Sequence, residues 1–466
     1  MLVVKSFVSL HSNTINTTHI DKMKKTALIL TFAVAATLTA MAQTRPTARD
    51  EIRKLPRLAG SNYLAYLDPV APLAKAPKGY EPFYMSHYGR HGSRWLLGDG
   101  DYMGPIRTLR KADNEGKLTA QGKQLLADLE RFYPTTVRRL GDLTTVGERQ
   151  HHGIGRRMTE HFPEIFSGNA EVDARSTVVI RCILSMTAEC EEIAAYNPKV
   201  KIHNDVSESL QYYLNKGFSG VVRQQNDNGN RGREVNAAKQ RYTHPERFSR
   251  LIFNDQKYVA DSLNAGSFMR SIFNVATNMQ SHDTDIDLLP LFTNDELYDL
   301  WKITNIDWYL GYGAAPQTGS VMPFSQDELL RNILTTADTC VVKKGWNGAT
   351  LRFGHEICVM PLACLLELDD CGIVWEDMET LDQHWVNYRI YPMACNIQLV
   401  FYRPKKGDGP ILMKAMLNEK ETTIANLHTD QYPYYRWEDF KAYFTKKLDD
   451  FKTKYPIEQY QQQRRR

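Results

Sequence analysis

Two arginines flank a histidine in the segment Arg90-His91-Gly92-Ser93-Arg94, and this combination of side chains suits chemistry on a phosphate group. A phosphate monoester carries close to two negative charges, so a neutral nucleophile can approach phosphorus only when cations hold the phosphoryl oxygens. Guanidinium groups bind these oxygens in pairs of hydrogen bonds, and their charge disfavours protonation of a neighbouring imidazole. The segment therefore predicts a phosphate-binding loop in which His91 is the nucleophile.

A second segment, Arg352-Phe353-Gly354-His355-Glu356, could supply the proton that hydrolysis of a phosphate ester requires. An alkoxide is a poor leaving group, and a carboxylic acid beside the phosphate can protonate it. We expect Glu356 to be this acid. Because an unperturbed glutamate titrates near roughly pH 4.3, we also expect an acidic or weakly acidic pH optimum.

These segments resemble the histidine acid phosphatase family. The family signature RHGxRxP is RHGSRWL in this chain, with Leu96 in place of the proline, and RSTVVIR at residues 175–181 is similar to the RSTxxxR segment of the family. The resemblance implies that His91 forms a phosphohistidine intermediate. It also implies a set of phosphate ligands, namely Arg90, Arg94, Arg175 and His355.

The resemblance covers roughly residues 80 to 450 and is strongest to the multiple inositol polyphosphate phosphatases, because of the stretch Leu417-Asn418-Glu419-Lys420. That branch has His-Ala-Glu where this chain has His355-Glu356, and other members of the family have His-Asp. The resemblance implies a phosphate monoester hydrolase that acts on inositol polyphosphates such as phytate and needs no metal or other cofactor. The alternatives are a broad-specificity acid phosphatase for sugar phosphates and a non-catalytic phosphate-binding homologue.

Strand and helix patterns alternate around the candidate residues. Residues 82–86 form a short apolar run that leads into the loop at His91. Residues 170–174 lead into the RSTVVIR segment, which is followed by an amphipathic stretch. Such alternation predicts an α/β fold with a mostly parallel central sheet flanked by helices. The family resemblance implies that this is a phosphoglycerate-mutase-like core.

We expect the core to consist of two parts of the chain, residues 43–204 and 326–466. Residues 205–325 contain a polar loop and two helical patterns, at residues 258–274 and 295–304, and this predicts a mainly helical cap with the substrate cleft beneath it. Near the end of the chain, two alternating segments surround a Lys-Lys-Gly-Asp-Gly turn, which indicates a β-hairpin.

The N-terminal segment has the layout of a secretion signal. Lys24-Lys25 precedes an apolar stretch at residues 27–38, which is too short to cross a bilayer comfortably, and Ala40-Met41-Ala42 has the small-x-small pattern of a cleavage site. We therefore predict that residues 1–42 are a signal peptide, with translation starting at Met23. The mature protein should be periplasmic or secreted, without stable membrane insertion, and this disfavours a mutase-like transferase of intracellular substrates.

Charge and cysteine content restrict the function further. The chain has 58 basic and 54 acidic residues, and removal of residues 1–42 leaves it nearly neutral. We therefore expect no nucleic-acid partner, and any affinity for a small phosphorylated substrate must be local. Seven cysteines would allow up to three disulfides in an oxidising compartment, with buried free thiols as the alternative.

Three histidine patterns could instead indicate a metal site. His87 and His91 would share a helical face, but Gly89 between them disfavours a helix. His355-Glu356 opens an HExxH-like segment, yet Val359 occupies the place of the second histidine. The adjacent pair His151-His152 is better explained as part of a polar helix face.

Four basic residues in the predicted cap could form a rim for a polyphosphorylated substrate, or could be ordinary solvated loop charges. They are Lys216, Arg223, Arg231 and Arg233.

Overall fold

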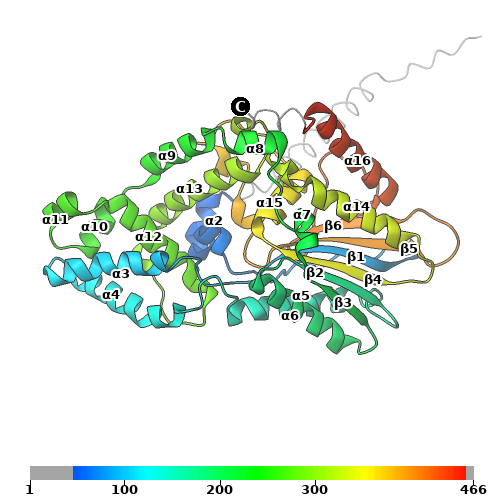
Figure 1. Cartoon of the computed structure of the whole chain (residues 1–466), viewed down its shortest axis with the longest axis horizontal. Helices are drawn as coiled ribbons and strands as arrows, with labels where there is room; N and C mark the ends of the chain where they lie inside the picture. The colour runs from blue at the N-terminus through cyan, green and yellow to red at the C-terminus, as the bar shows by residue number, and fades with distance from the viewer. Residues whose placement is uncertain (1–45, 458–466) are drawn as a thin grey trace, which may run out of the picture. The chain divides into compact units, whose positions relative to one another are not determined.

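The central sheet is built around strand β1, which ends at the predicted phosphate-binding loop (Figure 1). The fold is that of a computed structural model that describes residues 46–457, so the predicted signal peptide lies outside the described residues. The unit described below begins at Ala48. The strands are β1 (Tyr80–Arg90), β2 (Glu171–Ser176), β3 (Lys201–Asp205), β4 (Gly348–Gly354), β5 (Asn396–Pro404), β6 (Leu412–Leu417), β7 (Lys420–Glu421) and β8 (Tyr435–Arg436). The helices are α2 (Ala48–Lys54), α3 (Asp99–Asn114), α4 (Ala120–Phe132), α5 (Thr145–His161), α6 (Ile180–Tyr196), α7 (Gln211–Leu214), α8 (Gly220–Asn226), α9 (Asn230–Tyr242), α10 (Glu246–Ile252), α11 (Gln256–Ser262), α12 (Ala265–Asn278), α13 (Asn294–Tyr312), α14 (Asp327–Val341), α15 (Glu356–Leu365) and α16 (Trp437–Lys454).

The strands lie in the order β3-β2-β4-β1-β5-β6-β7, and β8 pairs with β6. Strands β3, β2, β4 and β1 are parallel to one another, whereas β5 to β8 pair antiparallel with their neighbours. This confirms an α/β fold whose central sheet has a parallel core. The predicted hairpin is also present, because Ile397 on β5 pairs with Leu417 on β6.

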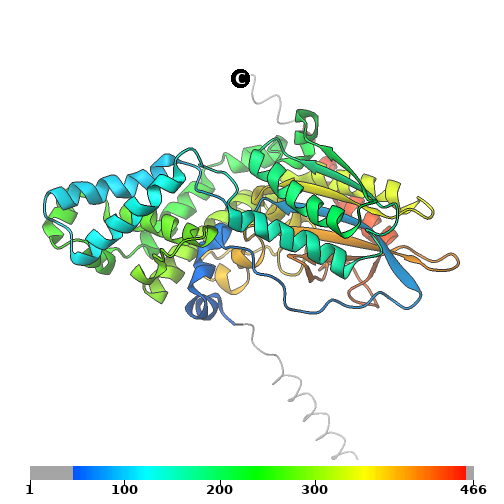
Figure 2. The ribbon, with the colours of Figure 1, turned by 90° about the horizontal axis from the view of Figure 1, so that it is seen from below.

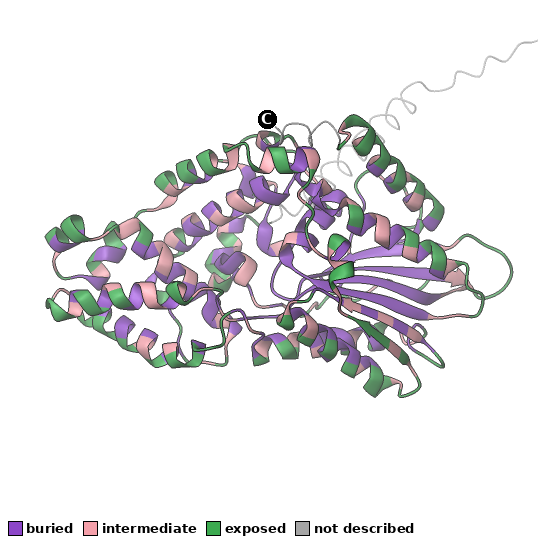
Figure 3. Ribbon diagram, viewed as in Figure 1, coloured by how far each residue is buried: buried purple, intermediate pink, exposed green. Residues whose placement is uncertain are grey.

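Helices cover both faces of the sheet. On one face α5 and α6 pack side by side, as Figure 2 shows, and bury Ile154 and Met186 against Phe353 of β4. On the other face α14, α15 and α16 bury a second apolar cluster that includes Tyr84 and Phe401. Strands between two helical layers are buried on both sides, and β1, β4 and β5 accordingly contain continuous runs of buried residues (Figure 3).

The helical region draws on two parts of the chain. Helices α7 to α13 fall within the predicted range 205–325, but α3 and α4 come earlier and lie beside α12 and α10 (Figure 1). Residues 99–132 therefore belong with these helices in space, although the domain boundaries themselves stay a prediction.

The helix predicted at residues 258–274 is two helices in the structure. Helix α11 ends at Ser262, and the side chain of Asn264 accepts a hydrogen bond from the Ser267 N–H at 2.8 Å, which caps the start of α12. Within residues 46–457, none of the helices has both the length and the apolar character that a membrane span requires.

Candidate active site

Two parallel strands bring the two predicted motifs together. Arg90 at the end of β1 pairs with Gly354 at the end of β4, so the next residues, His91 and His355, leave the sheet side by side. Their ring centroids are 5.6 Å apart, and the His91 N–H donates to the Gly354 carbonyl at 3.0 Å. Ligand sites in open α/β sheets lie at this carboxyl edge.

Glu356 lies at the start of α15 and faces the first motif. One of its oxygens, Oε2, is 3.0 Å from Nε of Arg90 and 3.7 Å from Nε2 of His91. Burial raises the pKa of the Glu356 carboxyl, but the nearby Arg90 and Arg94 guanidinium groups outweigh this effect and lower it to about 2. In the substrate-free site Glu356 is therefore a carboxylate at any physiological pH.

His91 has the protonation state that a nucleophile needs. Its Nδ1 lies 2.9 Å from the Gly92 carbonyl oxygen, and because a carbonyl can only accept, Nδ1 must carry the proton. The lone pair is then on Nε2, the nitrogen near Glu356. Burial, together with Arg90 and Arg181, holds the pKa of His91 well below its ordinary value of 6.5, so the ring is neutral.

Three guanidinium groups surround these residues. Arg94 and Arg181 both lower the pKa of His91 and of His355, which places their charges beside both rings. Burial is the main reason that the pKa of His355 falls to about 4. Each guanidinium has a buried nitrogen without a hydrogen-bond partner among the described residues: Nη2 of Arg90, Nε of Arg94 and Nε of Arg181. Unsatisfied buried donors are costly, and a phosphoryl group could accept from all three.

The structure does not bring Arg175 to this site, which corrects the expectation that it is a phosphate ligand. Arg175 lies within β2, and its side chain donates to the carboxylate of Asp173 and to the hydroxyl of Tyr213, at 3.1 Å from the latter. Residues two apart in a strand share a face of the sheet, so Asp173 is always beside Arg175. Arg181, in the first turn of α6, is the arginine of the RSTVVIR segment that lies at the site. The sequence could have indicated this residue, because Arg181 is the second arginine of that segment and stands at its end.

Leu96, where the family has proline, is held by hydrogen bonds. Its N–H donates to the Tyr102 hydroxyl at 2.9 Å, and its carbonyl accepts from the Gly141 N–H at 3.0 Å. A proline has no N–H and could not form the first bond.

Two of the four predicted rim residues lie close to the site. Lys216 and Arg231 both lie over the ring of Tyr312, with Lys216 Nζ at 5.8 Å and the Arg231 guanidinium carbon at 5.6 Å from its centroid. Burial is the main reason that the pKa of Tyr312 rises to about 12, and Glu356 also raises it, so Tyr312 is near the reacting groups. Arg231 also pairs with Asp307 at 2.7 Å.

The other two rim residues form local interactions. Arg223 on α8 pairs with Asp227 at 3.7 Å, and Arg233 on α9 donates to the side chain of Asn230 at 2.9 Å. Their side chains are more than half exposed, at 52% and 68%, as expected for solvated charges.

The other histidines are explained by the fold. His87 lies in β1, not in a helix, and is fully buried 3.8 Å from Glu189. His151 is also buried, with Nδ1 2.7 Å from Glu189, so the prediction of a polar helix face was wrong for it. The prediction holds for His152, which is partly exposed and pairs with Glu192 at 2.9 Å.

Nitrogen and oxygen atoms of His91, His355 and Glu356 lie within 4.8 Å of one another, a spacing that could hold a metal ion. The neighbouring guanidinium groups of Arg90 and Arg94 make the potential here positive, which disfavours a divalent cation and favours an anion. We therefore expect that a chelator such as EDTA leaves the rate of phosphate release unchanged. Loss of activity on chelation, restored by one added metal, would show instead that His91, His355 and Glu356 bind a catalytic ion.

All seven cysteines are buried, and six of them are free thiols, so the structure forms none of the possible disulfides. The six are Cys182, Cys190, Cys340, Cys358, Cys364 and Cys395.

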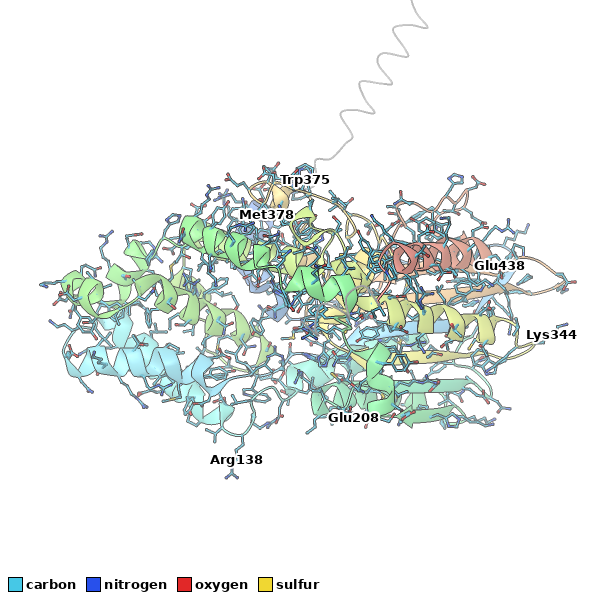
Figure 4. The ribbon with its side chains drawn as sticks, turned by 45° about the horizontal axis from the view of Figure 1, so that its top comes forward. Arg138, Glu208, Lys344, Trp375, Met378 and Glu438 are labelled. Carbon is cyan, nitrogen blue, oxygen red and sulfur yellow. The ribbon has the colours of Figure 1, made fainter. Side chains whose placement is uncertain are left out.

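A cavity of about 610 Å³ lies away from the motifs, between α9 and the segment that carries Met378, which Figure 4 labels. None of the site residues lines this cavity, so geometry and charge, not cavity size, identify the candidate active site.

No protein-family model matches the chain, and no curated protein matches it. Solved structures do. The multiple inositol polyphosphate phosphatase of Bifidobacterium longum in complex with inositol hexasulfate has a TM-score of 0.68 at 16% identity, over 83% of this chain and 97% of that chain. The phytase from D. castellii has a TM-score of 0.63 at 15% identity, over 84% of this chain and 85% of that chain. The Hafnia alvei phytase with myo-inositol hexakis sulphate has a TM-score of 0.51 at 12% identity, over 79% and 98% of the two chains. The chain therefore has the fold of these phosphatases.

Proposed function

We propose that the protein is a histidine acid phosphatase, a phosphate monoester hydrolase that acts through a phosphohistidine, with inositol polyphosphates such as phytate as substrates. One observation carries this proposal: three guanidinium groups with unpaired buried N–H donors surround a neutral imidazole whose Nε2 lone pair is available. A dianionic phosphoryl group would satisfy these donors and would meet the nucleophile directly. The shared fold supports the proposal.

The first step forms the phosphohistidine. Nε2 of His91 attacks phosphorus while Arg90, Arg94 and Arg181 hold the phosphoryl oxygens, and His355 can donate a further hydrogen bond. The bond from phosphorus to the leaving oxygen breaks, and Glu356 gives its proton to that oxygen. In the second step the Glu356 carboxylate takes a proton from water, which attacks phosphorus, so the bond to Nε2 breaks and phosphate leaves.

Glu356 must be protonated for the first step, although its pKa is low in the substrate-free site. Bound phosphate brings two negative charges next to the carboxylate and engages the guanidinium groups that stabilise it. Both effects raise the pKa of Glu356 in the complex. We therefore propose that the substrate itself brings the proton donor into its active form.

Polyphosphorylated substrates are supported by the two basic residues over Tyr312. Lys216 and Arg231 are not among the residues that would hold the reacting phosphate. Both lie over the ring of Tyr312, and the side chain of Lys216 is exposed. Cations in this position could bind other phosphates of the same ring. The complexes of the similar phosphatases with inositol hexasulfate are consistent with a ligand of this kind.

Phosphate release from phytate, a sugar phosphate and p-nitrophenyl phosphate, measured across pH, tests the proposal. We expect release from all three, with the highest kcat/KM for phytate. Equal kcat/KM for phytate and the sugar phosphate would favour the broad-specificity alternative. Binding of phytate without any release would establish a non-catalytic phosphate-binding protein.

We also propose that the protein is exported to the periplasm or secreted, on the basis of the N-terminal sequence pattern. N-terminal sequencing of the mature protein should begin at Gln43. A mature chain that retains residues 23–42 in the cytoplasm would contradict export.

A further inference from the structure

The peptide group between Gly92 and Ser93 determines how the His91 ring is held. Its carbonyl oxygen accepts the hydrogen bond from Nδ1 of His91 at 2.9 Å. Its N–H, which belongs to Ser93, donates to Oε1 of Gln150 at 2.9 Å. Because both polar groups of one planar unit are engaged, any rotation of this peptide would break the bond to Gln150 and the bond to His91 together.

The side-chain amide of Gln150 has a fixed orientation. While its Oε1 accepts from the Ser93 N–H, its Nε2 donates to the Ser93 hydroxyl oxygen at 3.0 Å. The reversed amide would place an NH₂ group against an N–H, so the hydrogen-bond partners require the orientation described.

Helix α5, which carries Gln150, is itself held firmly against the loop. The Ser93 carbonyl accepts from both the N–H and the hydroxyl of Thr144, at 2.9 and 3.1 Å, at the point where α5 begins. Gly147 allows this approach, since a Cβ there would lie 2.3 Å from the Ser93 carbonyl oxygen. Gln150, one turn into the helix, therefore reaches the loop from a rigid support.

We propose that Gln150 is a positioning residue for the nucleophile: through the Gly92–Ser93 peptide it keeps the proton of His91 on Nδ1 and leaves Nε2 unprotonated and directed at the phosphate site. A hydrogen bond accepted from a peptide N–H polarises the peptide and makes its carbonyl a stronger acceptor. The ring nitrogen that carries the proton is determined by the hydrogen bond that it makes. The catalytic consequence rests on the proposed function of His91, whereas the tautomer itself does not.

Ser185 has a different role in the same loop. Its Oγ accepts from the Gly92 N–H at 3.1 Å and donates to the Arg181 carbonyl at 2.8 Å. The bond between Ser185 and the Gly92 N–H holds the His91–Gly92 peptide, which precedes the Gly92–Ser93 peptide whose carbonyl accepts from Nδ1. It therefore cannot replace the bond that the Ser93 N–H donates to Gln150.

Two substitutions and a matched control test the proposal. Gln150→Leu removes both hydrogen bonds, Gln150→Glu keeps an acceptor oxygen for the Ser93 N–H, and Gln124→Leu changes an exposed glutamine on α4. The readouts are kcat and KM for p-nitrophenyl phosphate and the nitrogen-15 shifts of the His91 ring, which report its tautomer.

We expect Gln150→Leu to lower kcat about 10- to 100-fold with little change in KM, since the nucleophile is misplaced but the phosphate ligands remain. The ring nitrogen shifts should change to those of mixed tautomers. Gln150→Glu should recover most of kcat and the Nδ1–H tautomer, and Gln124→Leu should match the wild type.

A Gln150→Leu protein with unchanged ring nitrogen shifts would overturn the proposal, whether or not kcat falls. If that variant does not fold, the same shifts in Gln150→Glu decide, because loss of the Nδ1–H tautomer with the acceptor retained would overturn the proposal as well. A wild-type protein without phosphatase activity would refute the proposed function, and the tautomer measurement would still test the role of Gln150.

Discussion

Replacement of His91 by alanine should abolish turnover of every phosphate monoester, with kcat lowered by about 10⁴-fold or more. The nucleophile forms the bond to phosphorus, and the neighbouring imidazole of His355 is not placed to replace it, because its ring centroid is 5.6 Å away and the two rings meet at an angle of 72°. The effect should be equally large for phytate and for p-nitrophenyl phosphate. Initial rates of phosphate release measure it.

Binding of inorganic phosphate should survive the His91→Ala substitution, because the guanidinium groups remain. His203→Ala, which removes an exposed histidine from the edge strand β3, is the matched control and should retain wild-type activity. Substantial residual turnover in a phosphate-binding His91→Ala protein would contradict the assignment of the nucleophile.

Replacement of Glu356 by glutamine should depend strongly on the leaving group. For phytate, whose leaving alkoxide needs a proton, we expect kcat to fall about 10²- to 10⁴-fold. For p-nitrophenyl phosphate, whose phenolate leaves without protonation, the loss should be much smaller. Comparable losses for both substrates would show that Glu356 positions Arg90 rather than donating a proton.

The pH dependence should follow from the same group. The pKa of Glu356 is about 2 without substrate, and we expect bound phosphate to raise it, so kcat for phytate should fall as pH rises through the pKa of the complex. This limb should be weaker for p-nitrophenyl phosphate and absent in Glu356→Gln. Glu328→Gln, an exposed glutamate in the first turn of α14, is the control and should leave the profile unchanged.

Much of the site could be predicted because its residues are neighbours in the sequence. Arg90, His91 and Arg94 occur within five positions, and His355 and Glu356 are adjacent, so each motif needed only a strand that ends at the correct place. The apolar run at residues 82–86 indicated the strand before the first of these motifs. The parallel pairing of β1 and β4 unites the motifs and agrees with the mostly parallel sheet that the alternating pattern predicts, although that pattern does not determine which strands are neighbours.

The sequence pattern did not show which arginine of the RSTVVIR segment lies at the phosphate site. Residues 175 and 181 both belong to RSTVVIR, and the choice between them depends on where β2 ends and α6 begins. Such boundaries are the least certain part of a sequence-based interpretation. The same limit explains the undivided helix that we expected at residues 258–274, where Asn264 begins a new helix.

Contacts between distant parts of the chain were also beyond the sequence. His151 is buried because Glu189 on another helix and Phe353 on β4 pack against it, with the ring of Phe353 at 6.1 Å. Helices α3 and α4 join the helical region because α10 and α12 lie beside them. Neither local spacing nor hydrophobic pattern contains this information.

Calorimetric titration of inorganic phosphate into the wild type, Arg181→Leu and Arg175→Leu tests the convergence of the guanidinium groups most directly. We predict that Arg181→Leu weakens phosphate binding about 10- to 100-fold, because a hydrogen bond to a charged group contributes about 1.5–3 kcal/mol, and that Arg175→Leu binds as the wild type does. Wild-type affinity in Arg181→Leu, or an equal loss in Arg175→Leu, would contradict the account.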